Sequence, residues 1–398
     1  MKIGPESRGF VFLLGALTAL TALAIDMSLP ALPTLGREFH ASPDRVQLTL
    51  SLFIGGYAIG QLFIGPLSDR FGRKPILILG LLLYMIAAGS CALAPGIGFL
   101  IASRLVMGFA GCVGPVLARA MVRDYFAGKT AAQMFSSLTA VFALAPLVAP
   151  TVGGWLLVHF GWRAIFVFLL AFALALTLAV ALVFAESLKH PDAEALRPSR
   201  LLSNYGAFLG NRISLGFALV NGLCWAGIFA FLSGSPFVFI EIYGVAPSRY
   251  GFYFGLSAVA LVMGALSNKW LLRRFGSSHV LRAGLGIVIV GGAIIFAACL
   301  TRIAGPLGIM AGMMVYIYGQ AMVMPNAMAA AMEPVAHMAG SGAALIGVVQ
   351  MLCGSLAGYA VNALYDGTPA PMGAVILATA LATVVIYWVV LRAHRSAG

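Results

Sequence analysis

Apolar segments of about twenty residues, almost free of charge, recur from one end of the chain to the other. Each is long enough to cross the hydrocarbon core of a bilayer as a helix. Charged residues make up 9% of the chain, against about 25% in soluble domains, so lipid is the expected main solvent. The sequence therefore predicts an all-α polytopic membrane protein. The twelve expected spans are 10–36, 46–66, 75–94, 98–122, 130–157, 162–185, 212–240, 248–270, 280–300, 305–330, 339–364 and 371–392.

The chain carries 24 Lys and Arg against 12 Asp and Glu, a net charge of +12. In a soluble protein this excess would suggest a nucleic-acid partner. Here most of the cations fall in alternate loops, on the side that holds the N-terminus, as the positive-inside rule expects. We therefore expect no nucleic-acid partner. We expect a multi-pass protein of the bacterial inner (cytoplasmic) membrane, with both termini in the cytoplasm.

A long polar interruption near the middle of the chain separates six spans from six. A weak internal repeat relates the two halves, since Arg70-Phe71-Gly72 matches Arg274-Phe275-Gly276 at the offset that also relates Pro43 to Pro247. Repeated six-helix halves are typical of alternating-access transporters. The expected organisation is an N-terminal six-helix bundle over 1–185, a cytoplasmic linker over 186–211 and a C-terminal six-helix bundle over 212–398.

The densest polar run in the first third of the chain is residues 65–74, GPLSDRFGRK, between two expected spans. Its three cations predict a tight cytoplasmic turn. Gly65 and Gly72 suit a backbone that turns sharply. An acid, Asp69, lies inside this basic run, where it could meet a helix N-terminus or a cation.

Several motifs resemble those of the major facilitator superfamily, and within it those of twelve-span drug:proton antiporters. Residues 65–74 match the loop motif G-x-L-x-D-R-x-G-R-K, and residues 104–111, RLVMGFAG, resemble the fourth-helix motif. Residues 145–154, APLVAPTVGG, resemble the fifth-helix motif of exporters. Residues 26–33, DMSLPALP, and Arg123-Asp124 resemble the Bcr/CflA group, whose members export bicyclomycin, chloramphenicol-type and other small drugs.

The resemblance implies a gating set at the cytoplasmic side. Asp69 would cap a helix of the second half in the outward-open state, and Arg73 would pair with Asp124. Charge pairs that form in only one state bias a two-state equilibrium. The alternative is a solvated turn that only sets topology, which accounts for Lys74 and for Arg70. The full gating set is Gly65, Asp69, Arg70, Gly72, Arg73, Asp124, Pro146, Pro150, Gly153 and Gly154.

The prolines and glycines of the fifth-helix motif predict a bent span that packs closely against its neighbours. Such a helix could seal leakage or act as a hinge when the two halves rock. An ordinary kinked span is the alternative interpretation.

Asp26 lies well inside the first expected span. A carboxylate at a central position costs about 2.5–3.5 kcal/mol on insertion scales, so we expect it to face protein or water. Desolvation favours its protonated form and a nearby cation favours its ionised form. Asp26 is therefore the candidate for proton coupling and for binding a cationic drug. The alternative is an interfacial residue at the start of a loop.

Arg104, in the fourth span, is the expected partner of Asp26. A buried guanidinium needs carboxylate, carbonyl or water around it. Arg104 could sense the protonation of Asp26 or bind oxygens of the drug. The alternative is that its side chain extends to the outer interface from a helix start.

Polar and aromatic side chains within the spans are the candidates for lining a substrate cavity, because buried amide and phenol groups need partners. Their alternative role is to join helices to one another. Glu241 is expected to be an exposed charge at the outer rim rather than a second proton site. The substrate-binding candidates are Asp26, Tyr57, Gln61, Arg104, Asn221, Trp225, Phe231, Tyr316, Gln320, Asn326 and Gln350.

We find no phosphate-binding loop, no metal-ligand spacing and no nucleophile arrangement, so no catalytic site, metal or cofactor is expected. The predicted function is proton-coupled export of small lipophilic or amphipathic antibiotics, of the chloramphenicol, florfenicol or bicyclomycin kind, by a monomer that the proton gradient drives. One alternative is proton-linked uptake or export of a natural metabolite. Another is a membrane receptor that transports nothing.

Overall fold

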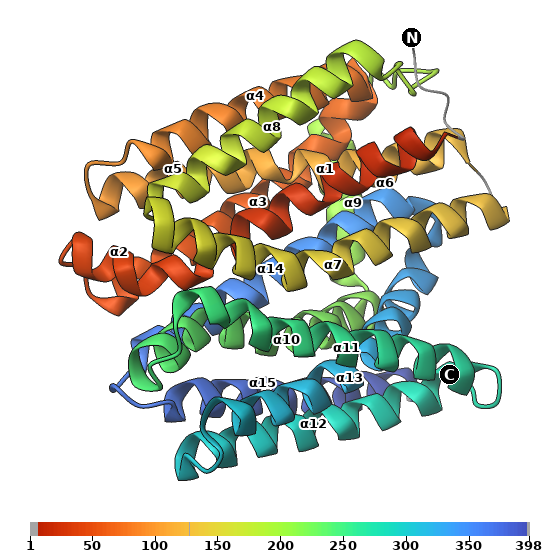
Figure 1. Cartoon of the computed structure of the whole chain (residues 1–398). Coiled ribbons are helices and arrows are strands. Elements are labelled where there is room, and N and C mark those ends of the chain that lie inside the picture. Colours follow the sequence, from red (N-terminus) through yellow and green to blue (C-terminus); the bar gives the residue numbers. More distant parts are fainter. Residues whose placement is uncertain (1–6, 127, 396–398) are drawn as a thin grey trace. The chain divides into compact units, whose positions relative to one another are not determined.

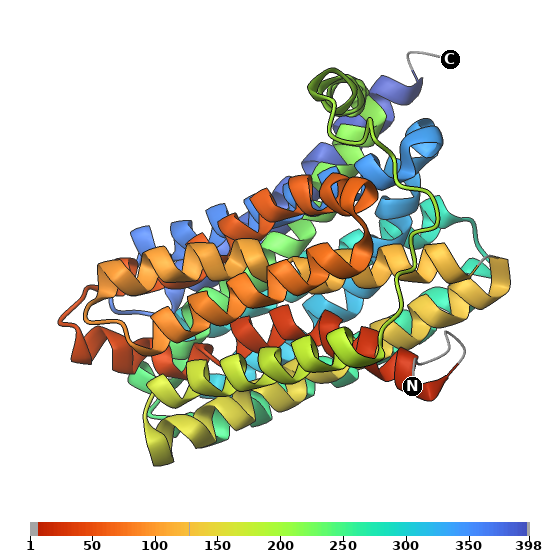
Figure 2. The same cartoon turned by 90° about the horizontal axis from the view of Figure 1, so that it is seen from above.

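The computed structural model describes residues 7–126 and 128–395, and the elements in these ranges are all helical. The chain divides into two compact units, Met1–Leu202 and Ser203–Gly398 (Figures 1 and 2). The boundary between them falls inside the predicted linker, in a short helix, α9 (Pro198–Gly210). The two units are described separately.

The first unit packs α3 on α5, α4 on α8, and α1 on α6 and α7. A bend or turn of a few residues joins most neighbouring helices (Figure 1). Its helices are α1 (Arg8–Asp26), η1 (Leu29–Ala31), α2 (Leu32–Glu38), α3 (Pro43–Phe71), α4 (Arg73–Ala92), α5 (Ile97–Gly111), α6 (Val113–Tyr125), α7 (Gly128–Phe160) and α8 (Arg163–Val183).

In the second unit, α10 packs on α13, α14 and α15, and α12 packs on α13 and α15. A π-helical turn, η2, continues α10, and a 3₁₀ segment, η3, joins α13 to α14. The helices are α10 (Arg212–Pro236), η2 (Phe237–Ile242), α11 (Pro247–Leu272), α12 (Ser277–Thr301), α13 (Gly305–Met332), η3 (Glu333–Met338), α14 (Ala339–Ala363) and α15 (Ala370–Arg395).

Within the described residues, eleven helices or continuous helix pairs are long and apolar enough to cross a membrane. They correspond to eleven of the twelve predicted spans. The predicted span 130–157 falls on α7, a helix of 33 residues, in which Val148–Phe160 is a shorter apolar stretch. The side chains of much of the first half of α7 lie outside the described part. The all-helical, multi-pass prediction is therefore confirmed.

Two spans predicted as single helices are broken. The first breaks after Asp26, where α1 ends. Proline has no backbone N–H, so Pro30 cannot donate to the Asp26 carbonyl as a continuous helix would require. The fourth breaks at Cys112, between α5 and α6. There Pro115 cannot donate to the Gly111 carbonyl, and the Thr21 hydroxyl of α1 donates to it instead at 2.9 Å.

The prediction of a ten-residue turn over 65–74 was wrong. Helix α3 continues through this run to Phe71, and α4 begins at Arg73. Gly72 alone joins them, with a φ of +99°. Because this left-handed conformation is rarely adopted by residues with a side chain, glycine at this position makes the abrupt reversal possible.

Glycine brings α3 and α5 into backbone contact. A Cβ atom built on Gly56 would lie 2.1 Å from the Leu105 carbonyl oxygen, and one on Gly108 would lie 1.9 Å from the Phe53 carbonyl oxygen. Small residues allow such close approach between helices in a membrane. Gly56 and Gly108 therefore allow the backbones of α3 and α5 to touch.

We predict that Gly56→Ala destabilises the protein, whereas the neighbouring Gly55→Ala does not. A Cβ on Gly55 has no atom within 4 Å, but one on Gly56 meets backbone that cannot move aside. Overpacking of this kind costs about 1–3 kcal/mol. Thermal unfolding of the two purified variants in the same detergent would show the difference. Equal unfolding temperatures would contradict the packing of α3 on α5.

Candidate functional site

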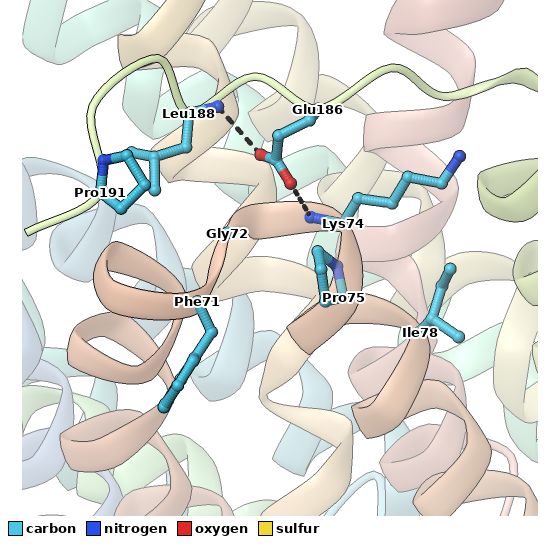
Figure 3. Close-up of a pocket in the computed structure, with 8 residues that line it drawn as sticks. All are labelled: Phe71, Gly72, Lys74, Pro75, Ile78, Glu186, Leu188 and Pro191. Carbon is cyan, nitrogen blue, oxygen red and sulfur yellow. Dashed lines mark hydrogen bonds between the residues drawn. The ribbon is translucent and has the colours of Figure 1, made fainter.

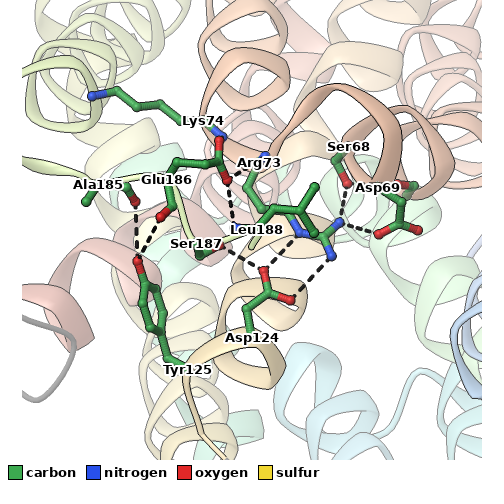
Figure 4. Close-up of polar contacts among 11 residues, drawn as sticks. Ser68, Asp69, Arg73, Lys74, Asp124, Tyr125, Ala185, Glu186, Ser187 and Leu188 are labelled. Atoms are coloured by element: carbon green, nitrogen blue, oxygen red, sulfur yellow. Dashed lines mark hydrogen bonds and ion pairs between the residues drawn. The ribbon is translucent and has the colours of Figure 1, made fainter. Parts of the chain in front are cut away.

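A cluster of charged side chains surrounds Arg73, at the turn between α3 and α4 (Figure 4). Arg73 Nη1 lies 2.6 Å from Asp69 Oδ1, and its Nε lies 3.0 Å from Asp124 Oδ2 at the end of α6. Nη1 also donates to Ser68 Oγ at 2.7 Å. Arg73 is 5% exposed, so a buried cation is neutralised by two carboxylates. The predicted pairing of Arg73 with Asp124 is present in the structure.

A second acid, Glu186, caps the start of α4 from the segment that follows α8. Its Oε1 accepts from the Arg73 backbone N–H at 3.0 Å, and its Oε2 accepts from the Lys74 N–H at 3.0 Å. A Cβ on Gly72 would lie 2.8 Å from Oε2. A carboxylate is favourable at a helix N-terminus, where unpaired N–H groups and the helix dipole meet. Gly72 thus provides both the turn and the room for Glu186.

Lys74 makes the reciprocal contact at the end of α8. Its Nζ donates to the carbonyl oxygens of Ala181 at 2.9 Å and of Phe184 at 2.7 Å. Ser187 Oγ donates to Asp124 Oδ2 at 2.8 Å, which extends the Arg73 cluster into the linker (Figure 4). The start of α4 and the end of α8 therefore cap each other with opposite charges.

Sequence reasoning missed Glu186 and Ser187 as parts of this cluster. The available signal was an acid immediately after an apolar span. A cavity of 520 Å³ lies beside Glu186, between the turn and the first residues of the linker (Figure 3). Its lining residues are Phe71, Gly72, Lys74, Pro75, Ile78, Glu186, Leu188 and Pro191.

The other members of the predicted gating set at this turn are placed differently. Asp69, expected to cap a helix of the second half, binds Arg73 in its own half. Arg70 is exposed and lies 5.3 Å from the ring centre of Phe71. Gly65 lies within α3 rather than at a turn, and its carbonyl accepts from Ser68 Oγ. Their gating roles remain predictions.

The fifth-helix motif lies on α7, beside the break in the first span. A Cβ on Gly153 would lie 2.2 Å from the Met27 carbonyl oxygen, so glycine lets α7 approach this backbone directly. Pro150 and Gly154 are buried nearby. Pro146 is part of the α7 helix, but its side chain lies outside the described residues.

Asp26 is the last residue of α1 and is 6% exposed. The interfacial alternative correctly anticipated a helix end at this point, but the side chain is buried. No hydrogen bond or ion pair joins its carboxyl to any residue in the described ranges. Burying a carboxyl without a partner costs much free energy when the group is ionised and little when it is protonated.

Arg104 is 1% exposed, so the alternative of a side chain reaching out to the interface was wrong. The expected contact with Asp26 is also missing from the ion pairs of the described residues. Instead, Nη1 donates to the Ala24 carbonyl at 3.1 Å and Nη2 to Ser28 Oγ at 3.3 Å. Nε donates to the Thr49 carbonyl at 3.2 Å, and the guanidinium stacks 4.3 Å from the centre of the Phe53 ring.

The helix break explains this arrangement. In a continuous helix the Ser28 N–H would donate to Ala24, but here it donates to the Ile25 carbonyl at 3.2 Å. The Ala24 carbonyl, released inside the membrane, is then bonded by Arg104 and by the Ser28 hydroxyl at 3.1 Å. Arg104 thus holds the chain on both sides of Asp26.

Most of the predicted cavity residues in the second unit join helices. Tyr316 Oη and Gln320 Nε2 both donate to the Cys224 carbonyl, at 2.9 and 3.4 Å. Asn221 Nδ2 donates to the Met324 carbonyl at 3.0 Å and accepts from Gln350. These contacts match the alternative interpretation, in which buried polar groups link helices.

The remaining candidates have varied surroundings. Asn326 donates to Asn268 at 2.8 Å. Phe231 packs against Phe239 and Phe254. The indole N–H of Trp225 is buried and has no hydrogen-bond partner among the described residues. In the first unit, Tyr57 and Gln61 are 7% and 5% exposed, and Gln61 Oε1 accepts no hydrogen bond from the part of the chain that the structure describes.

Comparison with known proteins identifies the family. A family model described as Major Facilitator Superfamily matches residues 14–358. The chain belongs to the Major Facilitator Superfamily. The structure of the xylose transporter XylE from Escherichia coli is similar in fold, with a TM-score of 0.69 at 15% identity, and the match covers 96% of this chain and 98% of that one. The expected major facilitator fold is therefore confirmed.

Several relatives in the superfamily are named as resistance proteins. The chain is 37% identical to an uncharacterized MFS-type transporter of Bacillus subtilis, over 95% of this chain and 94% of the relative. It is 33% identical to a bicyclomycin resistance protein homologue of Haemophilus influenzae, over 73% of each. It is 30% identical to a chloramphenicol resistance protein of Pseudomonas aeruginosa, over 75% of this chain and 70% of that one. The expected resemblance to drug-efflux members is confirmed.

We predict that Glu186→Gln lowers the stability of this superfamily member by about 1 kcal/mol, because it removes the charge that caps α4. The matched control is Glu194→Gln, which loses an ion pair with Arg197 whose side chains are 53% and 65% exposed. Exposed ion pairs contribute little to the free energy of unfolding, so this control should unfold at the same temperature as the wild type. Thermal unfolding at low ionic strength measures both. A Glu186→Gln variant as stable as the control would contradict the capping role.

Proposed function

We propose that this protein exports small lipophilic or amphipathic compounds, such as chloramphenicol- or bicyclomycin-like antibiotics, in exchange for protons. The superfamily membership and the resistance proteins among the relatives support transport of small molecules. The observation that carries the coupling is Asp26, a buried carboxyl without a bonded partner in the described part of the chain.

Asp26 would couple the two flows by changing its charge. When the carboxyl of Asp26 is protonated it is neutral, so its burial at the end of α1 costs little free energy. When ionised it must gain water, a cationic group or a rearranged neighbour, since an isolated buried charge is costly. Loss of the proton therefore favours a different arrangement of the broken first span around Asp26. The transported compound and the proton would then bind at Asp26 in turn, each displacing the other.

Arg104 would transmit this change. It bonds to Ala24 and Ser28, on either side of Asp26, and to Thr49 on α3. An ionised Asp26 would attract the guanidinium, which could then leave one of these oxygen atoms. Movement of Arg104 would thus alter contacts among α1, α3 and α5 without exposing a charge to lipid.

The Arg73 cluster would hold one of the transport states. Its pairs connect the ends of α3, α4 and α6, so they favour the arrangement in which these ends meet. Alternating access requires two states separated by a few kcal/mol, and contacts made in only one of them set the balance. Asp69, whose side chain is 46% exposed, is the member most free to exchange partners.

The setting proposed for this cycle is the bacterial inner membrane, with both termini in the cytoplasm. The protein would act as a monomer. It would use no bound cofactor, because the proton gradient supplies the energy.

The proposal predicts that Asp26→Asn abolishes proton-driven export but not folding. The amide keeps the shape and cannot release a proton. Uptake into everted vesicles under an imposed pH gradient should fall to that of vesicles without the protein. Asp44→Asn, an exposed acid in the first turn of α3, is the matched control and should transport normally. Export against a gradient by Asp26→Asn at the wild-type rate would contradict the proposal, and so would net inward movement of the compound into cells.

A further inference from the structure

Arg119 is a cation inside a membrane span, and it has no role in the proposed exchange of compound and proton at Asp26. It lies on α6, within the span Ile97–Tyr125, and it is exposed. Charged side chains at such positions almost always face the interior of a bundle or a water-filled cavity. Because Arg119 is exposed in the structure, it is not packed inside its own bundle.

The direction of the side chain excludes a simple interfacial role. Arg119 Nε donates to the Pro115 carbonyl at 3.1 Å, one turn earlier on α6. The side chain therefore runs away from Tyr125, the end of the helix that lies beside the Arg73 cluster. At 1.5 Å per residue, its guanidinium is at a level about 15 Å from that end. A long side chain that extended to the interface would point the opposite way.

Helix α3 supplies polar neighbours at this depth. Cys112, the residue immediately before α6, lies two turns before Arg119, and a Cβ on Gly60 would lie 2.5 Å from its sulfur atom. Gly60 stands between Tyr57 and Gln61, which are one turn apart. Arg119 Nε bonds to the Pro115 carbonyl, three residues after Cys112, so the guanidinium lies about 4.5 Å further along the helix axis than Cys112. Helices α3 and α6 are in contact with each other. Arg119, Tyr57 and Gln61 therefore belong to one region between α3 and α6.

This region is rich in donors and poor in negative charge. Arg119 takes part in none of the ion pairs of residues 7–126 and 128–395. Its only hydrogen bond there uses Nε, which leaves the two terminal nitrogens able to donate. A guanidinium presents a planar set of donors that matches a carboxylate or a similar pair of oxygen atoms.

We propose that Arg119, Tyr57 and Gln61 form a binding site for a carboxylate on the transported compound. The role in transport rests on the proposed export function, but binding can be measured without it. The site would make the protein prefer compounds that combine an apolar body with such a group.

The test compares two probes that differ only at that group, dansyl-phenylalanine and its methyl ester. Their affinities are measured by fluorescence titration of the purified full-length protein in nanodiscs. A charge-assisted contact should make the wild type bind the acid about tenfold or more tightly than the ester. R119Q should remove this preference, and R119K should keep part of it because a point charge remains.

R123Q is the matched control, because Arg123 is exposed one turn further along the same face of α6. It should retain the wild-type preference. As a second measurement, R119C should react with a charged methanethiosulfonate reagent, and the acid should protect it more than the ester does. This readout applies even if R119Q folds poorly.

Three results would overturn the proposal: a wild type that binds both probes equally or neither of them, an R119Q variant with an unchanged preference, and an R119C variant that does not react. In each case the export proposal would stand if the wild type still drives proton-linked flux. Conversely, a wild type that prefers the acid but shows no gradient-driven flux would keep this site and refute export.

Discussion

Backbone carbonyl groups released by helix breaks must find partners inside the membrane, where no water is available to bond them. Pro115 cannot donate to the Gly111 carbonyl, and the Ser28 N–H donates to Ile25 instead of to Ala24. Both released carbonyls accept hydrogen bonds from side chains of other helices. Thr21 takes the Gly111 carbonyl, and Arg104 takes the Ala24 carbonyl. The same contacts fix Asp26 at a helix end that is nevertheless buried. The position of the candidate coupling site therefore follows from the hydrogen bonds that other side chains make to the backbone at the break in the first span.

The two halves use different chemistry at corresponding places. In the first half, Arg73 at the start of α4 pairs with Asp124 near the end of α6. In the second half, Ser277 at the start of α12 donates to Asn326 near the end of α13 at 2.8 Å, and Asn326 donates to Asn268. Neutral hydrogen bonds thus stand where the first half has ion pairs. Because ion pairs respond to protons and to other charges, the first half is the part suited to switching.

The two halves differ in the kind of polar group that they hold within their spans. The first half holds Asp26, Arg104 and Arg119 within its spans. The amides and phenols of the second half mostly bond to carbonyls or amides of neighbouring helices. Interhelical bonds of this kind give stable packing at low electrostatic cost. In the proposed cycle, the polar groups of the second half therefore serve mainly to hold its helices together without charge.

Apolar runs of span length determined the helical, multi-pass fold, because lipid leaves the backbone few other solutions. The motifs likewise located the family and the contact of Arg73 with Asp124. Tertiary structure alone decided that Arg104 bonds to the Ala24 carbonyl and the Ser28 hydroxyl rather than to the Asp26 carboxyl. A released carbonyl exists only where one helix stops beside another. It also decided that Glu186 caps α4 from a distant segment, and that the Arg119 side chain runs back along α6, away from Tyr125. Periodicity shows which segments cross the membrane, but a side chain's partner depends on which helices pack together and at what depth.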